Sequence, residues 1–225
     1  ASGTGSRIDL SGLQTFVGYA TTIKALAGGE VDLGGAVSGS TVWTLQGAGS
    51  AFNMTRVSSL SGASLSVTNG QTLTFPQLTT LTDVDLLAWG GGLLAFPAAT
   101  NYVDTGYGQT LQASGPGSRI DLSHLLTFDG GNYSATQIKA LAGGEVDLGG
   151  VVSGNTAWTL QDPGSLFNVT NVTALGGASL SVSNGLALTL PQLITLPDVD
   201  LWACGGGEIA FPAATSYADT GYGQT

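Results

Sequence analysis

The chain has 225 residues, of which only 9% are charged, and 36 are glycine. The formal net charge is −10 with five basic residues, which argues against nucleic-acid binding because phosphate contacts need clustered Lys and Arg. The 42% of hydrophobic residues occur in regular alternation, so the composition does not predict disorder. Apolar runs fall short of the roughly 18 residues of a membrane helix, which predicts no membrane insertion. The single cysteine, Cys204, excludes an internal disulfide framework.

Two long repeats account for the chain. Residues 24–110 recur, mostly identical, as residues 139–225, and the segment GSRIDLS at Gly5–Ser11 recurs at Gly117–Ser123. The second copy carries three extra residues between Phe128 and Lys139. Such self-similarity is typical of arrays in which each unit buries its apolar face only against its neighbours. We therefore divide the chain into residues 1–112 and 113–225, which we expect to be continuous with each other.

A shorter repeat lies within each long one, and its first segment is Ile8-Asp-Leu-Ser-Gly-Leu. The pattern is apolar, any, apolar, small, any, apolar, and this alternation predicts a strand with one buried face. Equivalent segments begin at Ile8, Val31, Phe52, Leu73, Leu94, Ile120, Val146, Phe167, Leu188 and Ile209. A second apolar stretch precedes the glycines that close each unit, and glycine supplies the positive-φ corners of tight turns. The sequence predicts an all-β fold, a right-handed parallel β-helix of about ten coils, each 21–26 residues long.

A leucine-rich repeat is the alternative architecture, because its unit length and its L-x-L core are similar. That repeat needs a regular asparagine and a helical return segment. The sequence lacks both, which favours the β-helix.

Small hydrogen-bonding residues recur once per coil, and stacked coils place equivalent residues about 4.8 Å apart. We expect a polar ladder that satisfies hydrogen-bonding groups at a corner, with Ala174 as its one gap. An ice-binding array is the functional alternative. The predicted members are Thr15, Ser38, Ser59, Thr80, Asn101, Thr127, Ser153, Thr195 and Ser216.

Acidic residues form two further patterns. Asp9 stacks over Asp32, and Asp121 over Asp147, beside Arg7 and Arg119; we expect these groups to form a solvated face of ion pairs. A second pattern pairs carboxylates on one strand face, and carboxylates ligate Ca²⁺. These calcium candidates are Asp83, Asp85, Asp198 and Asp200. The sequence predicts no other cofactor and no catalytic residues, because it contains no positioned acid and base.

The motif G-[SG]-x-[IV]-D-L stands at Gly5–Leu10, Gly28–Leu33, Gly117–Leu122 and Gly143–Leu148. With the repeats around it, the whole chain resembles the β-helical repeat regions of large bacterial cell-surface and secreted proteins: adhesins, stalks and fibres. The resemblance implies an extracellular structural segment rather than an enzyme. A carbohydrate- or surface-binding adhesin module is the main alternative, and a polysaccharide lyase or hydrolase is a third class.

The two ends of the sequence match the interior of the repeat. Ala1–Ser6 resembles Ala113–Ser118, and residues 223–225 match residues 108–110, whereas solenoid ends normally carry polar caps. We therefore expect the partner to be the chain itself, by end-to-end stacking or by continuation into a longer array. Glycans or surfaces are further candidate partners.

Overall fold

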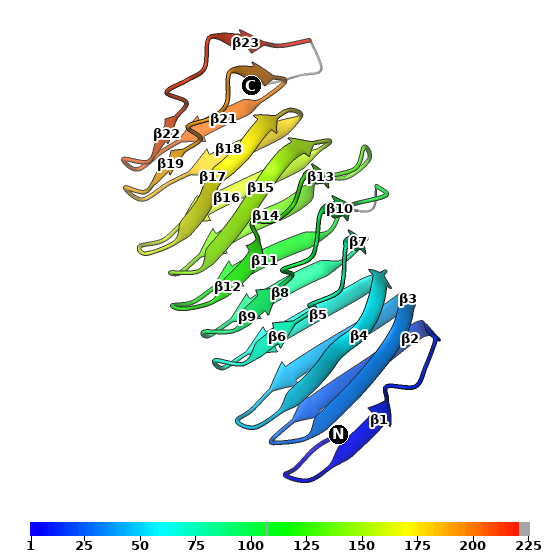
Figure 1. The fold of residues 1–225 in the computed structure, drawn as a ribbon. Helices are drawn as coiled ribbons and strands as arrows, with labels where there is room; N and C mark the ends of the chain where they lie inside the picture. Colours follow the sequence, from blue (N-terminus) through cyan, green and yellow to red (C-terminus); the bar gives the residue numbers. More distant parts are fainter. Residues whose placement is uncertain (107, 221–225) are drawn as a thin grey trace.

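A computed structural model describes residues 1–106 and 108–220, and it confirms the all-β prediction. These residues form parallel strands stacked as a β-solenoid of about ten turns, with no helix among them. The stack rises from coil 1, which contains β1, to coil 10, which contains β22 and β23 (Figure 1). Judged by strand register, the ten coils begin at residues 7, 30, 51, 72, 93, 119, 145, 166, 187 and 208.

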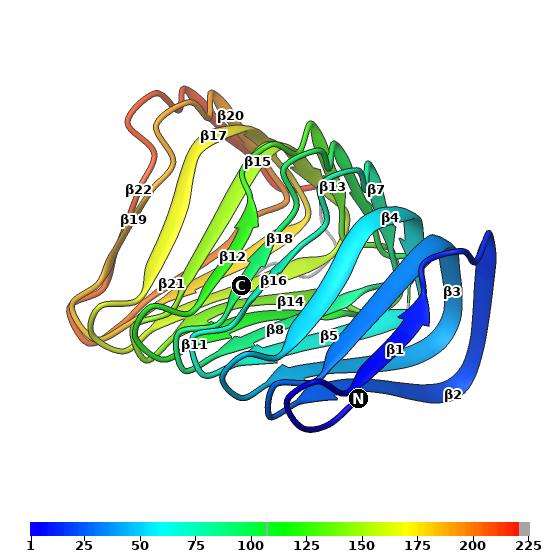
Figure 2. The ribbon, with the colours of Figure 1, turned by 60° about the horizontal axis from the view of Figure 1, so that its bottom comes forward.

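Three walls of strands enclose the interior (Figure 2). The first wall contains β1 (Arg7–Leu10), β6 (Thr72–Thr74), β9 (Leu93–Ala95), β12 (Arg119–Leu122), β19 (Ala187–Thr189), β22 (Glu208–Ala210) and the first parts of β3 (Glu30–Gln46), β4 (Ala51–Ser61), β15 (Glu145–Ser153) and β17 (Leu166–Leu175). The second wall contains β7 (Thr80–Thr82), β10 (Asn101–Val103), β13 (Thr127–Asp129), β20 (Thr195–Pro197), β23 (Ser216–Ala218), the first part of β2 (Thr15–Leu26) and the continuations of β3, β4, β15 and β17. The third wall contains β5 (Ala63–Thr68), β8 (Asp85–Trp89), β11 (Thr110–Ser114), β14 (Thr136–Leu141), β16 (Thr156–Gln161), β18 (Ala178–Val182), β21 (Asp200–Ala203) and the ends of β2 and β3.

The register of the first wall follows the predicted columns. Ile8 pairs with Val31, which pairs with Phe52, and in the middle of the stack Leu94 pairs with Leu73 and Ile120. All these ladders are parallel, and a strand such as β9 pairs with both neighbouring coils, through β6 and β12.

The interior is filled by the apolar residue of each alternating pair. Aromatic rings stack along it: Phe75 and Phe96 are parallel with centroids 5.3 Å apart. The buried Trp43 indole donates to Thr41 Oγ1 at 2.9 Å, so its polar atom is satisfied within the core. The largest fully buried side chains are Trp43, Trp158, Tyr102, Phe75, Phe96, Phe128, Leu33, Leu45, Met54, Leu60, Leu65 and Leu73.

The two long repeats join without a break in register. All three walls of coil 5 pair with coil 6, through β9 with β12, β10 with β13, and β11 with β14. The rings of Tyr102 and Phe128 stack across this junction with centroids 4.4 Å apart and planes 7° apart. The junction between the repeats is therefore paired in all three walls.

Tyr102 and Tyr217 occupy equivalent positions in the two repeats and give a matched test of buried hydrogen bonding. The Tyr102 hydroxyl donates to the Val84 carbonyl at 2.8 Å in the core, whereas Tyr217, which donates to Val199 at 2.9 Å, is 52% exposed. We expect Tyr102→Phe to lower the free energy of unfolding by about 1–2 kcal/mol, because the buried carbonyl loses its donor. Tyr217→Phe should cost under about 0.5 kcal/mol, since water can replace the hydroxyl. Denaturant unfolding measures both; equal losses would contradict the assigned burial.

Candidate interaction surfaces

The predicted polar ladder is wrong at two members. Thr15 pairs with Ala36, and Ala36 pairs with Ser59, so Ser38 lies two residues outside the column. In the second repeat Thr127 pairs with Val151, and Ser153 pairs instead with Asp129. With Ala174 also in the column, three of its positions carry no hydrogen-bonding side chain.

The error has a physical cause at the corner between the first and second walls. From Val31 to Val37 coil 2 advances six residues, whereas coil 1 advances eight from Ile8 to Phe16. Coil 2 makes this short corner with two glycines; Gly35 has φ +71°, and a Cβ there would collide with the Gln14 backbone carbonyl. The same geometry recurs at Gly150, with φ +74° against the Leu126 carbonyl.

Elsewhere the column has the predicted neighbours. Asn101 pairs with Thr80 on one side and Thr127 on the other, and Thr195 pairs with Ser216. Ser59 aligns with Thr80, because the residues that follow them, Leu60 and Leu81, are partners. The Thr127 hydroxyl donates to Asn101 Oδ1 at 2.7 Å. This hydrogen bond joins coils 5 and 6, so these two ladder residues have a structural role.

The four calcium candidates lie where the second wall turns into the third. Both carboxylate oxygens of Asp83 are engaged by Thr105 of the next coil, through its amide and its hydroxyl, at 2.7 Å each. Asp198 accepts bonds from the amide and the hydroxyl of Thr220, both on Oδ1. Within residues 1–106 and 108–220, no three His, Cys, Asp or Glu side chains form a group that could hold a metal ion. These aspartates hold the loop of the following coil.

Asp85 gives a pH-dependent test of this corner. Burial raises its pKa, the Asp104 carboxylate adds to the rise, and the hydrogen bond from the Thr110 amide opposes it. Because the folded-state pKa lies above the unfolded value, the contribution of Asp85 to stability falls as the pH rises through the folded-state pKa. The neutral variant Asp85→Asn retains an acceptor oxygen and should gain stability relative to the parent between about pH 3 and pH 7. Denaturant unfolding at both pH values measures this; a stability difference that is constant with pH would contradict it.

The stacked Arg and Asp residues differ from the expected solvated face. Asp32 and Asp147 are fully buried, each beneath the arginine of the preceding coil. Arg7 Nε donates to Asp32 Oδ2 at 2.6 Å, and Arg119 Nε donates to Asp147 Oδ2 at 2.5 Å. The second oxygen, Oδ1, of both aspartates has no hydrogen-bond partner. A β-bulge directly after each aspartate, beside the paired glycines, changes the local register.

The carboxylates around each pair are more exposed. Arg119 also lies 3.4 Å from Asp121 and 3.7 Å from Glu145. Burial and the Asp147 charge raise the pKa of Glu145. In the first repeat, hydrogen bonds from Ser11 lower the pKa of Asp9. Each guanidinium thus neutralises one buried carboxylate within a group of three acids.

Two equivalent recesses lie over the corner between the second and third walls. One of about 490 Å³ is lined by Gly62, Ala63, Ser64, Asp83 and Asp85 among others. The other, of about 440 Å³, is lined by the matching Gly177, Ala178, Ser179, Asp198 and Asp200. The exposed Tyr133 follows Asn132, which lines the second recess.

A set of buried serines was not predicted. Ser118 Oγ donates to the Ser114 carbonyl at 2.7 Å and accepts from the Gly91 amide of the preceding coil at 3.0 Å. Ser50 and Ser165 make the same two bonds at the same corner, between the third and first walls. The recurring pair Gly-Ser, at 49–50, 117–118 and 164–165, is the signal in the sequence that marks them.

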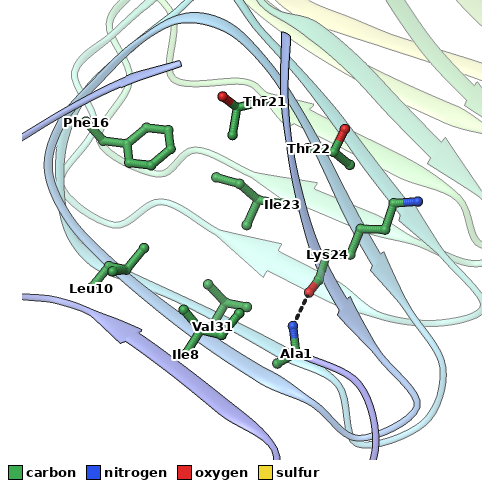
Figure 3. A pocket seen from close by; sticks show the side chains of 9 residues that line it. All are labelled: Ala1, Ile8, Leu10, Phe16, Thr21, Thr22, Ile23, Lys24 and Val31. Atoms are coloured by element: carbon green, nitrogen blue, oxygen red, sulfur yellow. Dashed lines mark hydrogen bonds between the residues drawn. The ribbon is translucent and has the colours of Figure 1, made fainter. Parts of the chain in front are cut away.

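An apolar recess lies on the outer face of coil 1. It has a volume of about 540 Å³ and is lined by Ile8, Leu10, Phe16, Ile23 and Val31 among others, side chains of the type that face the core in later coils (Figure 3). The Ala1 ammonium group donates to the Lys24 carbonyl at its edge, at 2.8 Å. This face presents core residues and unpaired strand edges at one end of the described stack.

Comparisons with known proteins gave no match to a protein-family model, to a curated protein or to a solved structure. None of the described residues forms a helix long and apolar enough to cross a membrane. The functional conclusion therefore depends on the geometry of the solenoid itself.

Proposed function

We propose that the chain is a structural segment of an extracellular filament, stalk or surface fibre built from stacked β-solenoid repeats. The observation that carries the proposal is the junction of coils 5 and 6, where all three walls continue in parallel register from one long repeat into the next. An array of this kind lengthens by adding repeats, since each coil contacts only its neighbours. Few charges and a continuous apolar interior suit a durable rod outside the cell.

Immunogold electron microscopy of the native source tests this role. Antibodies raised against the chain should label the length of surface filaments. Label confined to filament tips would favour the adhesin alternative. Label restricted to the cell interior would contradict the proposal.

The second candidate function, binding of glycans or surfaces, is favoured by one observation, the duplicated recess with its aspartates, one copy of which has Tyr133 next to its lining. Carboxylates accept hydrogen bonds from sugar hydroxyls, and an exposed tyrosine ring offers a stacking face. A glycan array checks this candidate: binding that is lost in the double variant Asp85→Ala/Asp200→Ala would support it, and an array with no binding would contradict it. No observation favours the third class, a polysaccharide lyase or hydrolase.

A further inference from the structure

We propose that Asn132 carries an N-linked glycan, whose first sugar lies in the recess over coils 6 to 9 between the second and third walls. The inference goes beyond the structural role and rests on its extracellular setting, since Asn-x-Ser/Thr acceptors belong to surface loops of secreted proteins. The sequence Asn132-Tyr-Ser134 has this form, and so do three others, which begin at Asn53, Asn168 and Asn171. The structure separates the first from the other three.

The other three acceptor sequences lie within β4 and β17, whose backbones pair with neighbouring coils. Asn53 Oδ1 accepts from the amide and the hydroxyl of Thr55 at 3.3 and 2.8 Å, and Asn168 Oδ1 accepts from the hydroxyl two residues on at 3.2 Å. At the equivalent position of coil 1, Asp9 accepts the same two bonds from Ser11. Two of the three sequences therefore close a local turn that Asp-x-Ser also closes, which accounts for them without a glycan.

Asn132 lies instead in the segment 130–135, which connects β13 to β14 and contains no strand. Residues 132–134 are exposed, and Tyr133 is 87% exposed. The second long repeat is three residues longer than the first in this region, and the matching segment 17–23 of the first repeat contains no acceptor sequence. A surface loop gives a glycosyl transferase access to the side-chain amide, whereas a paired strand restricts it.

The recess beside this loop has room for a sugar. Asn132 is one of the residues that line its volume of about 440 Å³, which is within the range of about 300–1,000 Å³ for small-molecule sites. Gly131, Gly154 and Gly177 line it on successive coils, and each would bring an added Cβ within 2.9 Å of the coil before it, so the backbones stack closely there without side chains. Amide, hydroxyl and carboxylate groups hydrogen-bond sugar hydroxyls, and the polar lining residues of these kinds are Asn155, Ser179, Asp198 and Asp200.

The covalent step joins Nδ2 of Asn132 to C1 of the first sugar. The co-reactant is a sugar activated through a phosphate ester at C1, carried on a lipid or on a nucleotide. The bond between C1 and the phosphate oxygen breaks, and the phosphate leaves with the electron pair. The bond between C1 and Nδ2 forms, and one Nδ2 proton passes to a base of the transferase, so the step needs no oxidant or reductant.

Peptide mass spectrometry of the protein from its native source tests the site directly. The peptide that contains Asn132 should carry the mass of one or more hexose or N-acetylhexosamine units. Peptides that contain Asn53, Asn168 and Asn171 should be unmodified, and they serve as internal controls. An Asn132 peptide found only in its unmodified form, or equal modification of the strand sites, would overturn the proposal.

Variants produced in the native source identify the linkage. Asn132→Gln and Ser134→Ala should each abolish the added mass, whereas Ser134→Thr keeps the acceptor sequence and should retain it. All three changes lie on exposed positions of the loop, and a strand-rich circular dichroism spectrum checks that each variant folds. A sugar that persists in Asn132→Gln would be linked through another residue and would overturn the assignment. The labelling of native filaments tests the structural role separately, so labelled filaments with an unmodified Asn132 would overturn the glycan alone.

Discussion

Gly150→Ala is expected to lower the free energy of unfolding by about 2–5 kcal/mol. The left-handed backbone at φ +74° costs an L-residue about 1–2 kcal/mol, and the added Cβ collides with the Leu126 carbonyl, a backbone atom that cannot swing aside, which adds about 1–3 kcal/mol. The corner is fixed between coils 6 and 8 by pairing on both sides, so it cannot relax locally. Denaturant unfolding with a linear extrapolation measures the loss.

Two further glycines separate the contributions of strain and collision. Gly185 has φ +73° with open space around it, so Gly185→Ala should cost only the strain, about 1–2 kcal/mol. Gly12 has neither a left-handed backbone nor a close neighbour, and Gly12→Ala should change stability by less than about 0.5 kcal/mol, or stabilise slightly. Equal effects at Gly150 and Gly185 would contradict the close approach of coil 6 to coil 7.

Arg119→Ala is the second large effect, with an expected loss of about 2–4 kcal/mol. The substitution leaves Asp147 buried with neither a counter-ion nor a partner for either oxygen. The estimate lies below that for a fully buried pair, because Arg119 is 40% exposed and water can reach part of the vacated space.

The double variant Arg119→Ala/Asp147→Ala gives the matched control. Removing both charges should recover about 1–2 kcal/mol of the loss, because the cost comes from the unpaired buried carboxylate rather than from a strong net attraction. Asp147→Ala alone should cost less than Arg119→Ala, since the freed guanidinium can turn toward water. A double variant less stable than Arg119→Ala would contradict the assignment of the loss to the unpaired Asp147 carboxylate.

The sequence predicts the architecture because two signals agree. Alternation within each short segment gives the strand, and its recurrence from Ile8 to Ile209 gives the stack. Both the alternation and its recurrence are set by the inward-facing residues, which must be apolar in every coil to fill the core. The first-wall columns are therefore confirmed throughout the segments that the structure pairs.

Three features depend on contacts that the repeat pattern does not encode. The predicted ladder is wrong at Ser38 because the spacing between first-wall strands does not determine how many residues form the corner between the first and second walls. The pair Gly34-Gly35 is the one signal in the sequence for the shorter corner of coil 2. Asp32 occupies an outward position, and its burial results from the bulge and from the Arg7 side chain above it. Cys204, which equates with Trp89, follows β21 and is exposed because the described residues of coil 10 include no third-wall strand that would cover it.

Cryo-electron microscopy of filaments isolated from the native source tests the central claim, that successive repeats continue one parallel solenoid. The account predicts a meridional spacing of about 4.8 Å along the fibre axis, with a longer period of about 24 Å for each five-coil long repeat. Filaments in which the 4.8 Å spacing is absent from the axis, or globular particles strung along a flexible thread, would contradict it.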